Sequence, residues 1–238
     1  MISFIVPAYN EERVLGATLD ALHAAARAVG EPYELVVADD ASTDRTAFVA
    51  RDHGARVVHA AHRQIAATRN SGAREAKGDL FVFVDADTTV NEAVVRSAVR
   101  AWRDGAVGGG AAVRFDGDVP WYARALLPVI VRLFRAARLA AGCFLFCTRS
   151  AFVSVGGFDE TFFGAEEVIM SRALKRQGKF VILRQVVRTS GRKLRTHSAG
   201  EVLLVMFRMA LRGTKAVRQR EGMELWYAER REDPQGDA

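Results

Sequence analysis

The stretch Leu80-Phe81-Val82-Phe83-Val84-Asp85-Ala86-Asp87 decides the fold that the sequence predicts. Its first five residues are continuously apolar and rich in Val and Phe, which is typical of a strand buried on both faces. Two carboxylates, Asp85 and Asp87, follow directly where this strand ends. Ligands of open α/β sheets bind beyond the carboxyl ends of the strands, so oxygen ligands here suit a divalent cation that holds a phosphate. A solvated Asp-rich turn is the alternative, because Asp is common in turns.

The chain on both sides of this strand alternates between strand and helix patterns. Apolar strands are expected at 2–6, 34–38 and 56–59, and helices at 11–29, 45–53 and 65–76. This alternation predicts right-handed crossovers and a mostly parallel central sheet of the α/β class, flanked by helices. Because parallel strands end at the same edge of a sheet, the polar residues that follow three of these strands should face one crevice. These residues are Tyr9, Asp39, Asp40, Asp85 and Asp87.

Composition limits what the chain can be and what it can bind. Half of its 238 residues are hydrophobic, which is enough for one large α/β domain with a sizeable core. The formal charge of +6 permits phosphate-bearing partners or anionic membranes without naming either. No helix-turn-helix pattern, Cys/His zinc spacing or RNA-recognition motif accompanies the charge, so we expect no nucleic-acid partner.

The cysteines and the hydropathy pattern bear on the compartment. Cys143 and Cys147 are too far apart along an extended chain to form a disulfide, which favours free thiols in a reducing compartment. A strand that starts at Ile2 leaves no room for a signal peptide, and no apolar run reaches the roughly 18 residues of a spanning helix. We therefore expect a cytoplasmic protein.

The later part of the chain contains a helix with two open interpretations. We expect strands at 109–115 and 143–147, and between them a helix at 121–139 interrupted by Pro128. Four arginines cluster on one face of this helix by their spacing, namely Arg124, Arg132, Arg135 and Arg138. A core helix with a solvated arginine edge is one interpretation. The other is an interfacial helix that makes a peripheral membrane contact and approaches a lipid-linked acceptor.

Two common phosphate-binding motifs do not occur in the sequence. No G-x-G-x-x-G follows the first strand, and no G-x-x-x-x-G-K-[ST] occurs anywhere. A dinucleotide-binding fold and a P-loop NTPase are therefore disfavoured. A crevice of acids without a glycine-rich phosphate loop indicates instead that a metal ion holds the phosphates.

Five segments match, in order, the pattern of one family. They are Val6-Pro7-Ala8-Tyr9-Asn10-Glu11-Glu12, residues 37–46, residues 67–72, the triplet Asp85-Ala86-Asp87, and Gly156-Gly157-Phe158-Asp159-Glu160. On these segments, which cover roughly residues 2 to 180, the chain resembles the inverting family 2 glycosyltransferases of the GT-A fold. The resemblance implies a hexosyltransferase that takes its sugar from a nucleotide-diphosphate sugar.

The resemblance assigns the nucleoside pocket to the first half of the chain. Pro7, Tyr9 and Glu11 would line this pocket, with Tyr9 placed to stack on the base. Asp40 would accept a hydrogen bond from the ring N–H of a uracil-like base, with Arg69 beside it. An ordinary half-buried loop aromatic is the alternative interpretation of Tyr9.

The resemblance also implies a metal site. In the triplet, which is a DXD motif, Asp87 would ligate Mg²⁺ or Mn²⁺ directly, and Asp85 would contact the ribose or, through water, the metal. A late histidine can complete the metal shell in related transferases, and His197 is the candidate here. Arg192, in the same basic, glycine-containing loop, is the candidate contact for the diphosphate.

The position of the catalytic base departs from the family pattern. The family usually has Glu-Asp and then Asp-Leu, whereas this chain has Glu166-Glu167 and then Ile169-Met170. Displacement at the anomeric carbon needs a carboxylate that takes the proton of the acceptor hydroxyl. We assign this role to Glu167, with Glu166 as the alternative. Acids favoured at a helix N-terminus by the helix dipole are the purely structural interpretation.

These observations predict one GT-A-like, Rossmann-like α/β domain. Residues 1–108 would form its nucleotide half, residues 109–198 its acceptor half, and residues 199–238 a C-terminal helix and charged tail. The predicted function is metal-dependent, inverting transfer of a sugar from a UDP- or GDP-sugar to an acceptor hydroxyl. A retaining reaction stays open, because retaining enzymes share much of the nucleotide half. The alternative functions are a polyprenyl-phosphate glycosyltransferase at the membrane surface and a catalytically silent sugar-nucleotide-binding protein.

Overall fold

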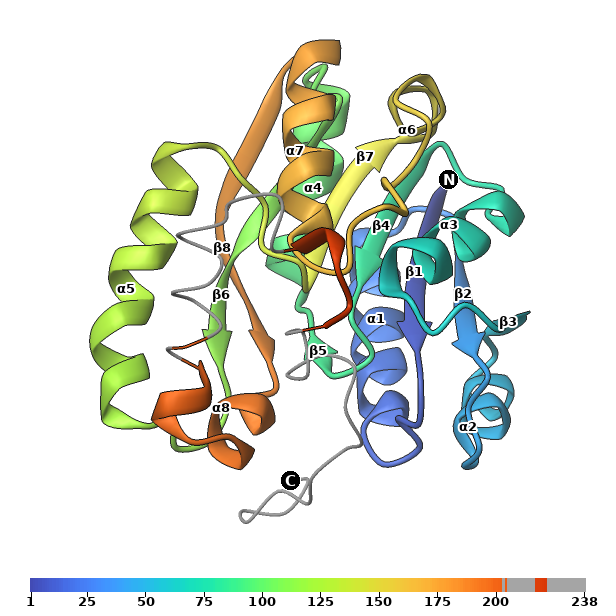
Figure 1. Cartoon of the computed structure of the whole chain (residues 1–238). Helices are drawn as coiled ribbons and strands as arrows, with labels where there is room; N and C mark the ends of the chain where they lie inside the picture. The colour runs from blue at the N-terminus through green and yellow to red at the C-terminus, as the bar shows by residue number, and fades with distance from the viewer. Residues whose placement is uncertain (203, 205–216, 222–238) are drawn as a thin grey trace.

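The structure of the protein, a computed structural model, describes residues 1–202, 204 and 217–221. Most of the C-terminal helix and charged tail expected at 199–238 lies outside these residues. Within them the chain forms one sheet of eight strands in the order β3-β2-β1-β4-β7-β6-β8-β5, with helices on both faces (Figure 1). The strands are β1 Ile2–Ala8, β2 Tyr33–Asp40, β3 Arg56–Ala60, β4 Leu80–Val84, β5 Thr88–Thr89, β6 Gly108–Phe115, β7 Phe144–Thr148 and β8 Phe180–Thr189.

The sheet is mixed, and its first part is parallel. Strands β3, β2, β1 and β4 are parallel neighbours, as the alternating pattern predicts. The predicted mostly parallel α/β fold is therefore confirmed. Strand β7 runs antiparallel to both β4 and β6, and β5 runs antiparallel to β8. Because β7 joins β4 to β6, one continuous sheet carries both halves of the chain.

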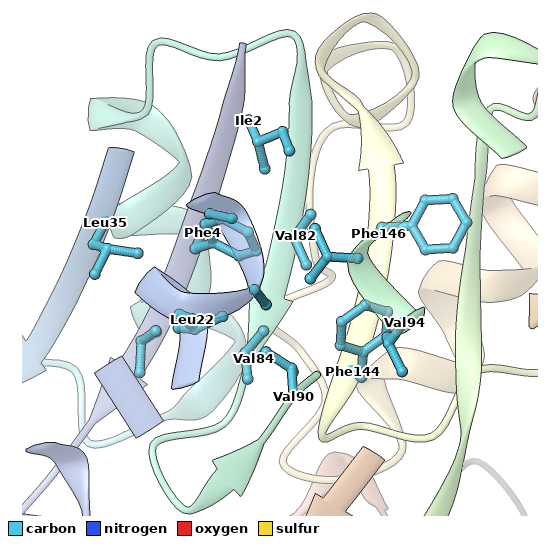
Figure 2. Close-up of a cluster of buried hydrophobic side chains, with 14 of the residues drawn as sticks. Ile2, Phe4, Leu22, Leu35, Val82, Val84, Val90, Val94, Phe144 and Phe146 are labelled. Atoms are coloured by element: carbon cyan, nitrogen blue, oxygen red, sulfur yellow. The ribbon is translucent and has the colours of Figure 1, made fainter. Parts of the chain in front are cut away.

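The central strand β4 is buried on both faces, as its composition predicts. Leu80, Val82 and Val84 pack into one apolar cluster, whereas Phe81 and Phe83 point to the opposite face and pack into a second. Figure 2 shows the first cluster, in which Val82 and Val84 of β4 lie between Phe4 of β1 and the phenylalanines of β7, with Leu35 of β2 on the far side of Phe4. The ligand-binding ends of the strands are thus held by a core on each side of the sheet.

Helices cover the two faces of the sheet. The first cluster packs under α1 and α4, and the second under α3, α6 and α7. The helices are α1 Leu15–Val29, α2 Thr46–Asp52, α3 Ile65–Glu75, α4 Glu92–Arg103, α5 Trp121–Ala136, α6 Arg149–Ser154, α7 Glu166–Gln177 and α8 Arg192–Thr196. Both α3 and α7 begin at the edge of the sheet where β1, β2 and β4 end, so their N-terminal turns can contribute to a site there.

Strand β1 is longer than the sequence predicts. The strand expected at 2–6 continues through Pro7 to Ala8. The ladder between β1 and β4 ends at Ile5, whereas the ladder with β2 continues to Ala8. Pro7 therefore lies where β1 pairs on one side only, and a residue without an N–H is tolerated there.

Helix α5 is not the core helix of the first interpretation, and the membrane contact of the second interpretation stays a prediction. Only Tyr122 and Ala123, in its first turn, are buried, so it is not a core helix. Its side chains form two apolar stripes, of which the outer one is exposed: Trp121, Leu126, Val129 and Leu133. Figure 1 shows α5 at the side of the molecule, next to β8 and β6. Among the described residues, no helix combines the length and the apolar character that crossing a membrane requires.

Candidate active site

A cavity of about 350 Å³ lies at the edge of the sheet where the acids were predicted. Five of the predicted site residues line it together, from the nucleotide half and from the acceptor half. They are Arg69, Asp85, Asp87, Glu166 and Glu167. Its other wall is formed by apolar residues of α5 and β6. The two carboxylates after β4 and the two at the start of α7 therefore share one space, as the sequence predicts for a catalytic site.

Arg69, on α3, connects the two groups of acids. Its Nη1 donates to Glu166 Oε1 at 2.7 Å, and its Nη2 donates to Asp85 Oδ1 at 2.7 Å. Nη2 also donates to the carbonyl of Gly142 at 2.9 Å. The Arg69 side chain is almost completely buried, and burial alone would lower its pKa, but the neighbouring carboxylates raise it above its usual value. Arg69 therefore stays charged and fixes two acids from different halves of the chain.

The two glutamates at the start of α7 have different environments. Glu166 is buried and its carboxylate is paired with Arg69, whereas Glu167 is half-buried and lines the cavity. Burial and the charge of Glu166 raise the pKa of Glu167 to about 8, although Arg69 acts in the opposite direction. A carboxylate with a raised pKa in a cavity is suited to accept a proton near neutral pH.

Asp87 lies in a strongly acidic part of the cavity. Its Oδ1 lies 3.4 Å from the Thr189 hydroxyl, which can donate to it. Burial, followed by the charges of Glu11 and Asp85, raises the pKa of Asp87 to about 6, and Lys193 and Arg192 partly offset this. A cation beside Asp87 would relieve the repulsion among these carboxylates.

The residues present fit a divalent cation that is bound partly by protein carboxylates and partly by the phosphates of a substrate. Among residues 1–202, 204 and 217–221, no three His, Cys, Asp or Glu side chains come close enough to hold a metal by themselves. Mg²⁺ usually binds through one or two carboxylates and completes its shell with phosphates and water. Asp87 and Asp85 can supply those carboxylates. His197 is not grouped with them among the described residues, and its role as a metal ligand stays a prediction. Its Nδ1 lies 3.0 Å from the Lys193 carbonyl.

Asp40 is fully engaged by the protein itself. Its Oδ1 accepts from the backbone N–H groups of His62 and Arg63, at 2.7 and 3.0 Å. Its Oδ2 accepts from the Gln64 N–H at 3.1 Å and from the Thr68 hydroxyl at 2.8 Å. A carboxylate has about four acceptor sites, so these four bonds use its capacity and hold the start of α3. Its predicted contact with a base stays a prediction, and Arg69 pairs with Glu166 and Asp85 instead of lying against Asp40.

The neighbouring Asp39 is bonded more loosely. Its Oδ1 accepts from the Ser42 N–H at 3.4 Å, and its Oδ2 lies 3.5 Å from His59 Nδ1. Asp39 comes from the same strand end as Asp40 but keeps more of its acceptor capacity. The sequence gives no means to choose between these adjacent acids, because the difference depends on the loop at 62–64.

Tyr9 lies at the end of β1 with an arginine on its ring. The guanidinium carbon of Arg63 lies 3.6 Å from the centre of the Tyr9 ring. Asn10, Ala41 and Arg63, which follow the ends of β1, β2 and β3, all have positive φ angles, between 50° and 60°. Non-glycine residues in this conformation are strained and cluster at functional sites. The strand ends at Tyr9 and Asp40 therefore have the backbone features of a binding site, as well as its side chains.

Glu11 and Arg192 pair with each other across the two halves. Arg192 Nη2 lies 3.4 Å from Glu11 Oε2, and both side chains are largely buried. Glu11 was predicted in the nucleoside pocket and Arg192 at the diphosphate, so the contact places these two predicted positions side by side. Neither residue lines the cavity that holds Glu167.

The glycine-rich motif at 156–160 joins the halves in another place. Asn70 donates to the Phe158 carbonyl at 2.9 Å and accepts from the Phe158 N–H at 2.9 Å. Gly156 and Gly157, both with a φ of 80°, make the turn that brings this segment to α3. The ring of Phe158 then lies 5.3 Å from the guanidinium of Arg69. The motif thus supports Arg69 and is not itself part of the cavity wall.

Sequence reasoning missed three residues at the site. Gly142 accepts from Arg69, and a Cβ atom there would lie 3.3 Å from the Glu167 carboxyl carbon. Lys193 lines the cavity near Asp87, and Cys143 lines it as a free, buried thiol. Lys193 belongs to the basic segment noted in the sequence, so the charge pattern could have identified it. Gly142 and Cys143 carry no comparable signal.

The match to a family model identifies the chain. The model described as "Glycosyl transferase family 2" matches residues 3–162, which is more than half of the chain. The chain belongs to glycosyl transferase family 2. The predicted family and the predicted class of enzyme are therefore confirmed.

The individual relatives share only part of their sequence with this chain. Validoxylamine A glucosyltransferase from Streptomyces hygroscopicus subsp. limoneus is 28% identical over 220 residues, which cover 75% of this chain and 48% of that protein. Undecaprenyl-phosphate 4-deoxy-4-formamido-L-arabinose transferase from Edwardsiella ictaluri (strain 93-146) is 36% identical over 98 residues, covering 36% of this chain and 29% of that protein. The chain thus spans about half the length, or less, of the curated relatives it matches.

A solved structure supports the fold. The mannosyltransferase PcManGT from Pyrobaculum calidifontis, in complex with GDP-Man and Mn²⁺, has a TM-score of 0.67 and 20% identity to this family 2 member. The similarity covers 88% of this chain and 61% of the mannosyltransferase. At this identity the comparison establishes the GT-A fold and nothing finer.

Proposed function

We propose that this family 2 glycosyltransferase moves a sugar from a nucleotide-diphosphate sugar to an acceptor hydroxyl, with inversion at the anomeric carbon. The observation that carries the proposal is Arg69, which holds Asp85 on the donor side and Glu166 on the acceptor side, each at 2.7 Å. This pairing fixes the Asp85-Ala86-Asp87 triplet relative to the start of α7. Glu167 is thereby held in the same cavity as the triplet.

Glu167 is the proposed base, and Glu166 positions it. In the reaction a lone pair of the acceptor oxygen forms the new bond to the anomeric carbon. The bond from that carbon to the diphosphate oxygen breaks, and its electron pair leaves with the nucleoside diphosphate. The hydroxyl proton passes to the Glu167 carboxylate. Glu166 is the poorer candidate because its carboxylate is occupied by Arg69.

The donor is proposed to bind along the ends of β1, β2 and β4. Tyr9 would stack on the base after Arg63 leaves its ring, and Pro7 and Glu11 would line the same pocket. Of the two adjacent acids, Asp39 has the acceptor capacity to take a base N–H, while Asp40 holds the loop around it. Arg192 and Lys193 would face the diphosphate.

Asp87 and Asp85 would hold a divalent cation, Mg²⁺ or Mn²⁺. When bound, the cation would supply positive charge next to the leaving diphosphate. The environment of Asp87 supports this assignment, because burial and then the charges of Glu11 and Asp85 raise its pKa, and a cation would offset these effects. The mannosyltransferase structure with Mn²⁺ and GDP-Man is consistent with such a site.

Calorimetric titration tests the donor site. UDP, GDP, CDP and dTDP are titrated with and without Mn²⁺ into the wild-type protein and into Asp87→Asn. We expect one nucleoside diphosphate to bind the wild-type protein only when Mn²⁺ is present. In Asp87→Asn, Mn²⁺ should no longer increase the affinity for this diphosphate. Glu92→Gln, on the exposed side of α4, is the matched control. Binding that ignores both the metal and Asp87 would refute the proposal, and metal-dependent binding without turnover on any acceptor would favour a silent binding protein.

Action at a membrane surface, as for a polyprenyl-phosphate transferase, is a second candidate. The exposed outer stripe of α5 favours it, with Trp121 81% and Leu133 63% exposed beside exposed arginines. Sedimentation with phosphatidylglycerol vesicles and with phosphatidylcholine vesicles tests this candidate. Trp121→Ser together with Leu133→Ser should abolish the association, and the absence of any association in the wild type would refute it.

A further inference from the structure

The cavity that contains Glu167 has two chemically different ends. One end holds the carboxylates and Lys193. The other end is formed by the inner stripe of α5, by small and apolar residues of β6 and by Ile182 of β8. The residues of the inner stripe are Leu127, Ile130, Val131 and Phe134. A ligand that fills this space must therefore be polar at one end and apolar along the rest.

The apolar part follows from the way α5 meets the sheet. The helix is buried only in its first turn, at Tyr122 and Ala123, so its later turns stand away from β6. Strand β6 contributes Ala111 and Ala112 to the wall, and these short side chains leave space that larger ones would fill. The inner stripe has the spacing of one helix face and points into this space. The volume of about 350 Å³ is within the range of small-ligand sites.

We propose that the acceptor is a neutral alcohol with a hydrocarbon chain, which lies between α5 and β6 and presents its hydroxyl to Glu167. This inference rests on the proposed function and adds the class of acceptor. A polyhydroxylated acceptor would leave its hydroxyl groups without partners against the inner stripe of α5. A hydrocarbon chain gains from burial there, by a factor of about four in affinity for each methylene.

The need for a base favours an alcohol over a lipid phosphate. A phosphate acceptor is already an anion and needs no base, so it would leave Glu167 without a role and would lie beside its carboxylate. Three cations of the described residues line the cavity, namely Arg69, Arg135 and Lys193. Arg69 is already paired with Asp85 and Glu166. A neutral hydroxyl does need a base, and Glu167 is placed to take its proton. The oxygen then forms the bond to the anomeric carbon as the nucleoside diphosphate leaves with the electron pair of the broken bond.

The free thiol of Cys143 provides a direct assay of occupancy. Cys143 lines the cavity, whereas Cys147 is fully buried in the second apolar cluster and does not line it. The wild-type protein is treated with N-ethylmaleimide in the presence of 1-hexanol, 1-octanol, octyl phosphate or glucose, and both thiols are followed by mass spectrometry. We expect 1-octanol to protect Cys143 at a concentration at least about tenfold lower than 1-hexanol, with no change in the rate at Cys147.

Two variants of α5 provide the matched comparison. Ile130→Trp fills the apolar end from the inner stripe, and Leu133→Trp adds the same ring to the outer stripe. Ile130→Trp should weaken protection by 1-octanol at least tenfold, and Leu133→Trp should change it by less than twofold. Ala112→Leu fills the same space from β6 and replaces Ile130→Trp if that variant does not fold. Transfer to 1-octanol from sugar donors of the nucleoside diphosphate that binds in calorimetry should follow the same order.

The outcomes separate this inference from the proposed function. Protection that does not depend on chain length, or that is stronger with octyl phosphate, overturns the acceptor inference, as does preferred transfer to glucose. If these results occur while a nucleoside diphosphate binds with metal, only the acceptor class is wrong. If no nucleoside diphosphate binds the wild-type protein, the proposed function fails, and the alcohol is then not an acceptor.

Discussion

The nucleotide half and the acceptor half use their polar side chains differently. In the nucleotide half, Asp40 makes four hydrogen bonds to the loop at 62–64 and to Thr68, so the protein itself occupies the carboxylate. In the acceptor half, Glu167 lines a cavity together with Asp85, Asp87 and Lys193 and with apolar residues of α5 and β6. Asp40 is bonded within the protein, whereas Glu167, the proposed base, faces the cavity. The difference teaches that two acids predicted at the same site can have very different bonding, so that one contributes to stability and the other keeps its carboxylate for the proposed chemistry.

Replacement of Glu167 should have the largest effect on activity. The effect should be on catalysis and not on nucleotide binding. Glu167→Gln removes the base but keeps the shape of the side chain, so we expect kcat to fall by about 100- to 10,000-fold. The affinity for the nucleoside diphosphate, measured by calorimetry, should change by less than twofold. The same replacement at Glu166 serves as the comparison, and an activity loss for Glu166→Gln but not for Glu167→Gln would reverse the assignment.

Replacement of Asp40 should destabilise the nucleotide half. Asp40→Asn directs an amide group at donors that need an acceptor, which we expect to cost about 1–3 kcal/mol of the free energy of unfolding in urea. Asp39→Asn, one residue earlier on the same strand, should cost less than about 1 kcal/mol, because its contacts are long. Equal losses for the two variants would remove the distinction between these acids. Asp39→Asn should also weaken nucleotide binding, measured by calorimetry, although it changes stability little.

The raised pKa of Glu167 should make stability depend on pH. Between its ordinary value of 4.5 and about 8, the folded protein keeps the proton that the unfolded chain releases, so stability falls as pH rises. Glu167→Gln removes this effect. Its Tm, measured without metal or nucleotide, should exceed that of the wild type by a margin that grows by at least about 2 °C from pH 5 to pH 8. A margin that is constant over this range would contradict the assigned environment.

The outer stripe of α5 should show the smallest effect. Leu133→Ser should change the free energy of unfolding by no more than about 0.5 kcal/mol, because the side chain is exposed. Leu174→Ala, in the second apolar cluster, is the comparison and should cost about 2–5 kcal/mol. A loss at Leu133 as large as the loss at Leu174 would mean that the outer stripe is packed in the folded protein.

The parts of the fold that were predicted correctly have local signals. Strand β4 was found because a run of five apolar residues is typical of a strand with a core on each face. The end of β1 was missed because it depends on where its ladder with β4 stops, which the sequence near Pro7 does not record. Helix α1 begins at Leu15 and not at Glu11, since residues 12–14 form a turn, and the Glu11 N–H donates to the hydroxyl of Thr46, 35 residues away.

The sequence predicted which residues lie together at the candidate site better than it predicted which of them contact one another. Asp85, Asp87, Glu166 and Glu167 do share a cavity, as the strand ends and the family motifs indicated. The role of Arg69 was not predictable, because its partner Glu166 is 97 residues away and the periodicity of α3 does not identify it. The cavity itself was not predictable either, since the spacing of apolar residues on α5 does not reveal how far the helix stands from the sheet.

The position of β7 has a consequence for attempts to isolate the nucleotide half. Strand β7 belongs to the acceptor half, yet it pairs with β4 along the whole of Leu80–Val84. A fragment that ends at residue 108 would leave β4 as an edge strand, with five apolar residues and no charge or proline within it. Such edges pair with other copies of the same chain. The fragment should therefore aggregate, and exchanging acceptor halves between relatives would succeed only if each graft carries its own β7.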